Sequence, residues 1–429
     1  MKKISLYIST LMLIAALFGC GEDRTHEFYE MTEENQWTFS KMKEVYLWAD
    51  SIKTPSRQEF FATTSKFFTS LKYKGDAASF FTDTVSAGSY GMTFALMRDP
   101  IGVRPSKTYA LALFVEPASP AAEAGIERGT WISSVGGKSL SISSAAMLQQ
   151  GDATDIVTER MEFDEETMRY SWSVADTLHM QRSTENEVCN IYDSSIYTVR
   201  DSRIGYLVVN SFNGDDFAVK ANGAVQYFEA ENVDAVIIDL RYNSGGSISN
   251  AASLAANFVP APLVGTPFAT LQGNGEEVDT VYNYPTPAAA LDGKKLYIIT
   301  GNATKGTAEL FVKSLKDSKG VYEVNVIGER TAGSNVMVEK FLSPYGFAIN
   351  PATAYIHTAD GTRLPASGVQ PQYNANELAQ KTCIYPLGNE QEYMLYSTLY
   401  LHVNGTLPVD APAIRHNVHC SSHSVPFIR

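Results

Sequence analysis

The stretch GNATKGTAELFVKSLK, residues 301–316, joins an apolar run to a helical pattern and so has the form of a strand turning sharply into a helix. Hydrolases often hold a nucleophile on such a turn. The turn offers Lys305, Gly306 and Thr307 and contains no serine. A threonine hydroxyl can attack a carbonyl when a base lies beside it, so Lys305 and Thr307 are candidates for covalent chemistry. Gly306, between them, has no side chain with which to attack.

A second turn could supply backbone amides for binding negative charge. The buried strand pattern AVIIDLRYNSGG ends in Gly245 and Gly246, and a helical pattern follows at once. Glycine lets amides approach a ligand closely, and a helix N-terminus adds positive potential. These amides could form an oxyanion hole, although an ordinary turn between strand and helix has the same pattern. Ser244 and Ser247 are interpreted as turn and capping residues.

Alternating strand and helix patterns between residues 190 and 372 predict how these turns are positioned. The alternation indicates βαβ units around a mostly parallel sheet. Ligands of such sheets bind at the carboxyl ends of the strands. In this chain those ends are predicted at residues 243–246, 302–307 and 330–334, so we expect the three turns to lie at one edge.

Two further regions precede this core. Residues 34–86 show helical spacing of aromatic and apolar side chains on both sides of Pro55, which predicts a small helical domain with an aromatic core. Residues 88–182 contain short β-like runs. Ser119 and Pro120 are typical of a helix start between two of these runs, and Gly136-Gly137 predicts a hairpin.

The first residues indicate export. Lys2 and Lys3 precede an apolar run that ends in Phe18-Gly19-Cys20, which is typical of a secretory signal over residues 1–20. A cysteine after a small residue resembles a bacterial lipobox, so Cys20 is predicted to carry a lipid; a cleaved signal with an incidental cysteine is the alternative. Polar residues 21–33 are predicted to be a tether. We therefore expect an exported lipoprotein of the cell envelope, at the outer membrane or cell surface.

Composition excludes some functions. Of the 429 residues, 44% are apolar and 19% are charged, and the net charge is −13, which suits a multidomain globular protein that repels nucleic acid. Cys383 and Cys420 could pair, but Cys189 leaves an odd count. The tail sequence RHNVHCSSH, residues 415–423, has ligand types for zinc, but its spacing fits no standard site and no metal is predicted.

Taken together, four motifs resemble the C-terminal processing, or tail-specific, serine peptidases. The first motif, VEPASPAAEAGIERGTWISSVGG, looks like the helix and following strand of a PDZ domain. The second, DLRYNSGGSI, resembles the family's Asp-Leu-Arg-x-Asn-x-Gly-Gly, and the third, GERTAGSN, resembles Gly-Glu-x-Thr-x-Gly-Lys. The fourth, GVQPQ, resembles Gly-[Ile/Val]-x-Pro-Asp. The resemblance covers residues 35–372. It implies an α/β multidomain protein: a helical N-terminal domain (34–86), a PDZ-like β-rich domain (88–182), a ClpP/crotonase-like peptidase core (190–372) and a C-terminal extension (373–429).

The same resemblance implies where the catalytic groups should lie. In the family a serine three residues before a glutamate attacks, and a buried neutral lysine is its base. With Glu309 as anchor, the nucleophile falls on Gly306 and the lysine on Ser334. A glutamine that orients this lysine in some members falls on Val338. Asp317 does match an acidic position that some members carry.

The binding groups of the family have better matches. The oxyanion hole would consist of the amides of Gly245, Gly246 and Thr307, and no cofactor is implied. In the PDZ-like domain, Tyr90-Gly91-Met92 fits the loop that holds a peptide carboxylate while the peptide adds to a sheet edge, although an ordinary strand start with a glycine fits too. The implied partner is a peptide or a protein C-terminal tail.

Three functions follow from these residues. The first is a catalytically degenerate homologue that still binds peptides, because the Gly-Gly turn is present and the dyad is missing. The second is an active serine- or threonine-type peptidase with a relocated dyad involving Lys305, Thr307 or Ser334. The third is a structural cell-surface module whose binding site is filled by its own side chains.

Overall fold

The computed structural model describes residues 25–83, 89–149, 151–182, 188–275, 280–379 and 384–409. The chain divides into two compact units. Unit 1 contains residues 1–83 and 340–351, and unit 2 contains residues 84–339 and 352–429. The chain therefore leaves unit 2 after Glu339, contributes a short segment to unit 1, and returns at Ala352.

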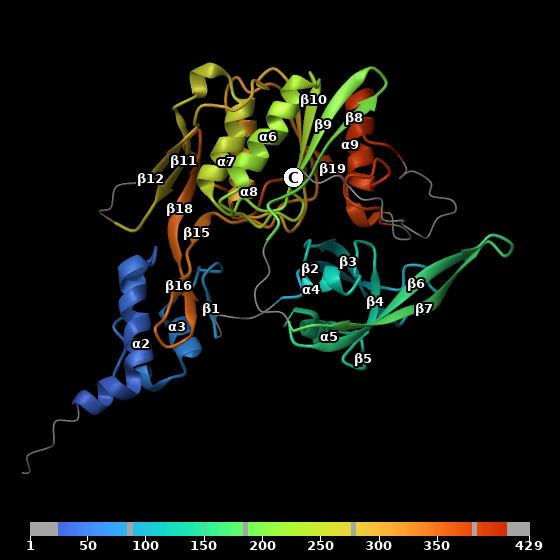
Figure 1. The fold of residues 1–429 in the computed structure, drawn as a ribbon. Helices are drawn as coiled ribbons and strands as arrows, with labels where there is room; N and C mark the ends of the chain where they lie inside the picture. Colours follow the sequence, from blue (N-terminus) through green and yellow to red (C-terminus); the bar gives the residue numbers. More distant parts are fainter. Residues whose placement is uncertain are drawn as a thin grey trace, which may run out of the picture. The chain divides into compact units, whose positions relative to one another are not determined.

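Unit 1 is built around one long helix and a small antiparallel sheet (Figure 1). Its elements in chain order are α2 (Thr25–Val45), η1 (Ala49–Ser51), η2 (Glu59–Phe61), α3 (Thr64–Leu71), β1 (Phe80–Thr82), β16 (Phe341–Leu342) and β17 (Ala348–Asn350). β17 pairs antiparallel with both β1 and β16. Aromatic side chains form the core: Phe60 packs on Phe67, and Phe347 lies between Trp37 and Phe81.

The β-rich subdomain, residues 89–182 of unit 2, is a sheet with two short helices. Its elements are β2 (Met92–Arg98), β3 (Thr108–Val115), α4 (Pro120–Glu123), β4 (Trp131–Val135), β5 (Lys138–Ser139), α5 (Ile142–Ala145), η3 (Ala146–Gln149), β6 (Thr154–Asp164) and β7 (Arg169–Met180). The strand order is β2-β3-β4-β6-β7, so β2 is an edge strand in the described chain. Ser119 caps α4 by accepting from the amide of Ala122, as the sequence predicts.

A six-stranded sheet forms the core of unit 2, in the order β19-β14-β13-β10-β9-β8. Its strands and the three helices between them are β8 (Ile191–Val199), β9 (Ser202–Val209), α6 (Phe217–Ala230), β10 (Ala235–Asp239), α7 (Ile248–Ala255), β13 (Lys295–Thr300), α8 (Thr307–Asp317), β14 (Val324–Gly328) and β19 (Tyr373–Asn374). All described pairs are parallel except β8 with β9. Helices α6, α7 and α8 contribute to one hydrophobic cluster with one face of the sheet (Figure 1).

The opposite face of the sheet is covered by the C-terminal segment. Helix α9 (Tyr393–Asn404) packs Met394, Leu395 and Leu399 against strand residues such as Ile237 and Ile299. The short helix η6 (Glu377–Ala379) lies between β19 and α9 along the chain. Residues 373–409 are therefore part of the folded core as far as the structure describes them.

The structure differs from the sequence-based expectations in three places. Helix α2 begins at Thr25, so much of the predicted tether, residues 21–33, is helical. A second, antiparallel sheet of unit 2 has the order β12-β11-β18-β15 and was not predicted; its strands are β11 (Pro267–Gln272), β12 (Thr280–Asn283), β15 (Val336–Val338) and β18 (Ala352–Thr358). The sequence also gave no sign that residues 340–351 belong with the N-terminal helices.

Candidate active site

Gly306 occupies a sharp bend between β13 and α8. It is the residue before the first turn of α8, with φ +59° and ψ −119°, a positive-φ conformation that residues with a Cβ rarely adopt. A Cβ atom at Gly306 would meet only the carbonyl oxygen of Ser244, 3.8 Å away. The backbone therefore has a sharp bend like that of a nucleophile turn, which glycine adopts without strain, and the space for a side chain there is open.

The Gly245-Gly246 turn lies directly against this bend. A Cβ atom on Gly245 would stand 3.3 Å from the backbone nitrogen of Thr307 and 3.4 Å from the carbonyl oxygen of Lys305. The hydroxyl of Thr307 donates to the carbonyl oxygen of Gly246 at 2.7 Å. The structure thus brings together Gly245, Gly246, Gly306 and Thr307, which lie at the carboxyl ends of β10 and β13.

Thr307 and Lys305 are poorly placed for a relocated dyad. The side chain of Thr307 is only 5% exposed, and its hydroxyl is engaged with Gly246 rather than directed outward. Lys305 is exposed, and its backbone amide donates to the carbonyl of Asn243 at 3.0 Å. No contact between the Lys305 amine and the Thr307 hydroxyl is found in the described chain.

Glu309 connects the bend to the loop that follows β14. One carboxylate oxygen accepts from the amide of Gly306 at 3.0 Å. The other accepts from the amide of Gly333 at 2.7 Å and from the hydroxyl of Thr331. Glu309 is fully buried, and this burial raises the pKa of its carboxyl even though the hydrogen bonds oppose the shift. The buried Glu309 carboxylate therefore holds the Gly306 bend next to the loop of Thr331 and Gly333.

The loop after β14 is held in turn by the GVQP segment. The hydroxyl of Thr331 accepts from the amide of Val369 at 2.7 Å, and the amide of Thr331 donates to the carbonyl of Val369 at 3.2 Å. A Cβ atom on Gly368 would stand 2.2 Å from the carbonyl oxygen of Thr331, so only glycine allows this close approach. The GERTAG and GVQP motifs are thus packed backbone to backbone.

The predicted lysine position is adjacent to this frame. Ser334 directly follows Gly333, whose amide donates to Glu309, and the Ser334 hydroxyl donates to the carbonyl of Val336 at 3.4 Å. Val338 lies in β15, and Asp317, at the end of α8, forms an ion pair with Lys313 at 2.6 Å. Ser334 is therefore placed beside the bend by Glu309, whereas Asp317 is satisfied within its own helix.

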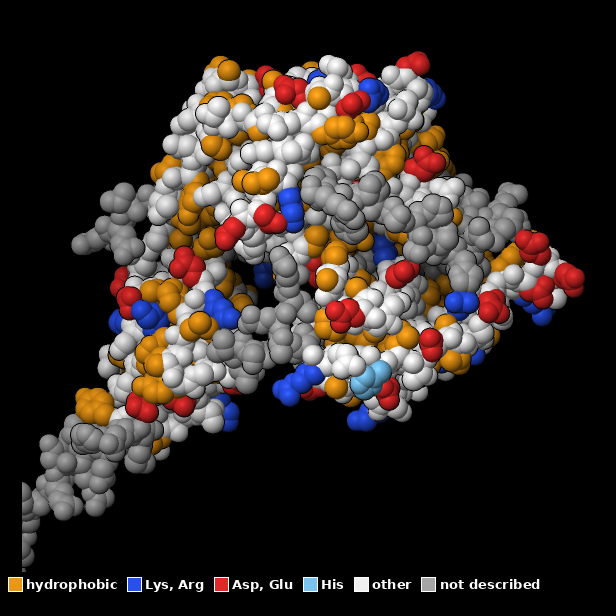
Figure 2. All heavy atoms as spheres, viewed as in Figure 1, with side chains coloured by type: hydrophobic (Ala, Val, Ile, Leu, Met, Phe, Trp, Pro, Cys, Tyr) orange, Lys and Arg blue, Asp and Glu red, His pale blue; other side chains and the backbone are white. Residues whose placement is uncertain are grey.

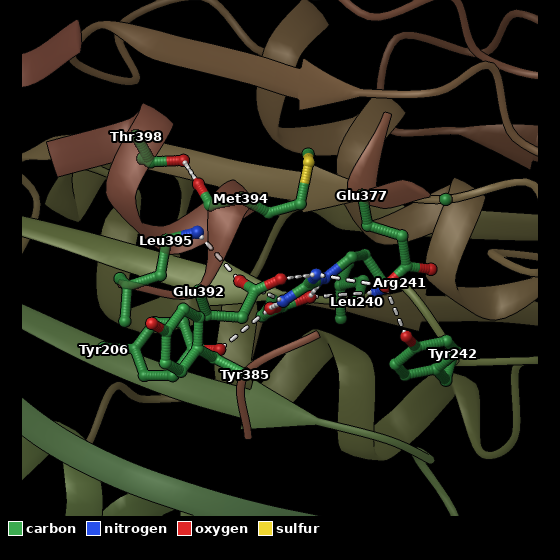
Figure 3. Close-up of polar contacts among 12 residues, drawn as sticks. Tyr206, Leu240, Arg241, Tyr242, Glu377, Tyr385, Glu392, Met394, Leu395 and Thr398 are labelled. Atoms are coloured by element: carbon green, nitrogen blue, oxygen red, sulfur yellow. Dashed lines mark hydrogen bonds and ion pairs between the residues drawn. The ribbon is translucent and has the colours of Figure 1, made fainter. Parts of the chain in front are cut away.

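Arg241, in the strand end just before the Gly-Gly turn, is held by a buried ion network (Figure 3). Its guanidinium contacts Asp239 at 2.7 Å and both oxygens of Glu392 at 2.7 and 3.0 Å. Burial alone would raise the pKa of Glu392, but the charges of Arg241 and Arg128 hold it below its ordinary value. Glu392 lies 151 positions from Arg241, so no local motif in the sequence indicates that they pair.

Arg128 of the β-rich subdomain joins the same network. It lies 2.9 Å from Glu377 and 3.2 Å from Glu392, and it donates to the carbonyl of Tyr385 at 2.9 Å and to the hydroxyl of Tyr242. The C-terminal segment therefore connects the subdomain to the strand end beside the site. No sequence motif indicated this role.

Tyr90, Gly91 and Met92 lie at the start of the edge strand β2. The ring of Tyr90 is buried in the subdomain core, and the amide of Gly91 donates to the hydroxyl of Ser89 at 3.1 Å. Met92, Phe94 and Met147, the last of which lies in η3, are each partly buried against the core of the subdomain. The backbone edge of β2 and the partly buried apolar side chains could contact a ligand, whereas the buried side chain of Tyr90 could not.

Other sequence predictions lie outside the described residues: the lipid on Cys20, the pair Cys383–Cys420 and the histidines of the tail. Within the described part of the chain, no group of three acidic, histidine or cysteine side chains could hold a metal. A search of those same residues also found no helix long and apolar enough to span a bilayer.

A mostly parallel sheet with a positive-φ bend after one strand, facing a Gly-Gly turn, defines a mixed α/β fold. Residues 203–375 match the family model described as peptidase family S41, and residues 33–86 match that of the peptidase S41 N-terminal domain. The chain is therefore similar to the S41 peptidases over these two ranges, and the first range contains the three motifs predicted in the core.

Curated relatives support this assignment. The chain is 25% identical over 264 residues to carboxyl-terminal-processing peptidase 2, chloroplastic, of Arabidopsis thaliana, which covers 60% of this chain and 48% of the relative. It is 24% identical over 310 residues to the carboxy-terminal processing protease CtpA of Bacillus subtilis, with 70% and 61% covered. The alignments thus span about half to three fifths of these relatives.

Two solved structures share the fold. A Bacteroides fragilis chain assigned to the S41 proteases has a TM-score of 0.72 at 24% identity, covering 86% of this chain and 97% of the other. The photosystem II D1 C-terminal processing protease has a TM-score of 0.50 at 17% identity, covering 81% and 93%. At these identities the likeness describes the mixed α/β multidomain fold.

Proposed function

We propose that this protein is a non-catalytic S41 relative that binds extended peptides or protein C-terminal tails. The observation that carries the proposal is Gly306, which stands in an open positive-φ bend where the nucleophile of the family belongs. Around it are the Gly245-Gly246 turn, the amide of Thr307 and the hydrogen bonds of Glu309 to Gly306 and Gly333. Backbone amides in this arrangement can bind a peptide, but positions 306 and 334 do not supply the serine nucleophile and the lysine base that would cleave it.

The β-rich subdomain acts as a PDZ-like binding module in this proposal. A peptide with a free carboxyl terminus would add as a strand to the edge of β2, and its last side chain would contact Met92, Phe94 and Met147. The backbone at Tyr90-Gly91-Met92 would hold the carboxylate. The amide of Gly91 would have to exchange its bond to Ser89 for one to the ligand.

The setting of this function is the bacterial cell envelope. The signal-like residues 1–20 and the cysteine at position 20 support an exported lipoprotein, anchored by lipid at the outer membrane or cell surface. Its partners would be exported peptides or protein tails and the membrane, and neither nucleic acid nor a cofactor is part of the proposal.

Labelled fluorogenic peptides test binding and turnover together. Binding without an increase in fluorescence is expected, and binding should be lost when the terminal carboxylate is amidated. Phe94→Asp should weaken binding because it places a charge among the apolar side chains, whereas Val219→Asp, on an exposed face of α6, is the matched control. Turnover that Thr307→Ala or Ser334→Ala abolishes would refute the proposal and favour a relocated dyad.

A fluorophosphonate probe provides a second, independent test. It acylates activated hydroxyls, so the wild-type protein should remain unlabelled. Labelling of Thr307 or Ser334 would contradict the non-catalytic assignment even if the natural substrate is not found.

A further inference from the structure

Aromatic side chains are exposed at the beginning of α2. Tyr29 is 55% exposed and Phe61 is 54% exposed. Both rings contact Phe28, with centroid distances of 5.5 and 5.7 Å. The guanidinium of Arg57 lies 5.1 Å from the same ring. We call these four residues, Phe28, Tyr29, Arg57 and Phe61, the aromatic surface.

The aromatic surface is more than isolated exposed residues. A single exposed apolar side chain is ordinary, but here two exposed rings share one neighbour and form a continuous apolar area. Figure 2, compared with Figure 1, shows hydrophobic atoms exposed at the start of α2. Aromatic rings together with an arginine are typical of protein surfaces at a membrane–water interface.

The position of Cys20 limits how far this surface can be from a membrane. Five Cα–Cα steps separate Cys20 from Thr25, where α2 begins, and they span at most about 18 Å even if fully extended. Tyr29 follows one helical turn later, about 6 Å along the axis. A lipid on Cys20 would therefore keep the aromatic surface within about 24 Å of the bilayer, about half its full thickness.

Charge favours one kind of lipid contact. With a net charge of −13, the protein is not attracted to anionic lipid. Aromatic rings enter the interface of neutral lipids without such attraction.

We propose that the aromatic surface of Phe28, Tyr29, Arg57 and Phe61 contacts the headgroup region of the membrane that holds the lipid anchor. The contact is a second attachment beside the lipid and restricts the orientation of unit 1 at the bilayer. It goes beyond peptide binding and rests on the lipid anchor proposed for Cys20, not on the chemistry at Gly306.

Tryptophan reporters in the lipidated full-length protein test this contact. Phe61→Trp places a reporter on the aromatic surface, and Tyr227→Trp, at a site on α6 that is 49% exposed, is the matched control. Both variants are incorporated into phosphatidylcholine liposomes with ordinary or brominated acyl chains. The added emission of Phe61→Trp should shift to shorter wavelength and be quenched by bromine, and that of Tyr227→Trp should change in neither respect.

Three results would overturn the inference. Equal emission of Phe61→Trp in both liposomes would show that the surface does not reach the bilayer. A shift that depends on protein concentration without lipid would show that a second copy covers it. Absence of acyl groups on Cys20 by mass spectrometry would remove the anchor on which the inference rests, while leaving peptide binding untouched.

Discussion

Placing the serine and lysine of the S41 dyad at positions 306 and 334 is the most direct test of whether the backbone around these positions can support the family's chemistry. The substitutions are Gly306→Ser and Ser334→Lys, made singly and together. Gly306 has a positive φ of +59°, so a side chain there carries a conformational cost of about 1–2 kcal/mol. It adds no steric cost, because only the Ser244 carbonyl lies within 4 Å of the new Cβ, at 3.8 Å.

The conformational cost is measured first, with Gly306→Ala in chemical denaturation. The free energy of unfolding should fall by about 1–2 kcal/mol. Gly368→Ala is the contrasting control, because its Cβ would stand 2.2 Å from the Thr331 carbonyl and overpacking adds about 1–3 kcal/mol to the backbone cost. Equal losses at the two positions would show that the space at Gly306 is not open.

Labelling with a fluorophosphonate probe then reports the chemistry. Gly306→Ser alone should remain unlabelled, since a serine without a base is a poor nucleophile. The double variant should be labelled at position 306, because one carboxylate, that of Glu309, holds both the Gly306 bend and Gly333, the residue before Ser334. A folded double variant that is not labelled would refute the reasoning that only the two side chains are missing.

Three further predictions concern buried groups. Glu392→Gln should lower the free energy of unfolding by about 3–5 kcal/mol, because it leaves the buried Arg128 and Arg241 short of a counterion. The control is Glu231→Gln, which removes one charge of an exposed ion pair and should cost less than about 1 kcal/mol. Urea denaturation measures both values. Burial raises the pKa of the Asp193 carboxyl from 3.8 to about 7. The protonated carboxyl therefore favours the folded state below about pH 4, and the free energy of unfolding should fall by on the order of 4 kcal/mol as the pH rises to 7. Asp193→Asn should remove this fall, which a pH series of unfolding free energies measures. Thr331→Val should cost about 1–3 kcal/mol by leaving the Val369 amide unpaired, and peptide affinity should fall with it; unchanged affinity and stability would contradict the role given to this hydroxyl.

Local signals allowed much of this structure to be predicted from sequence. Ser119 and Pro120 specify the start of α4, because a capping hydroxyl and a fixed φ act within a few residues. The apolar run before Thr300 and the small residues after it specify β13 and the bend at Gly306 for the same reason. Helix starts and turns of this kind are determined by residues close together in the chain, so they can be predicted from a single sequence.

Contacts between distant segments could not be predicted in this way. Arg241 and Glu392 are 151 positions apart, and neither has a local pattern that specifies its partner. β17 pairs with β1 across about 270 positions, and its three residues are too few for a strand pattern to assign them to unit 1. Glu309 did leave a signal, since a carboxylate within the apolar stretch AELFV must find hydrogen bonds when buried, but the sequence does not show which amides supply them.

A glycine at position 306 suits the backbone conformation of this bend. A serine in the positive-φ bend would store about 1–3 kcal/mol, which an active enzyme tolerates for the sake of chemistry. Glycine adopts φ +59° without that strain, so the bend at Gly306 is more stable here than with a nucleophile. Glu309, which is fully buried, still uses hydrogen bonds to hold this bend beside the loop of Thr331 and Gly333. A surface that binds a ligand must keep its shape, and the Glu309 carboxylate holds the Gly306 bend beside the loop of Thr331 and Gly333; this is why peptide binding is the function we propose.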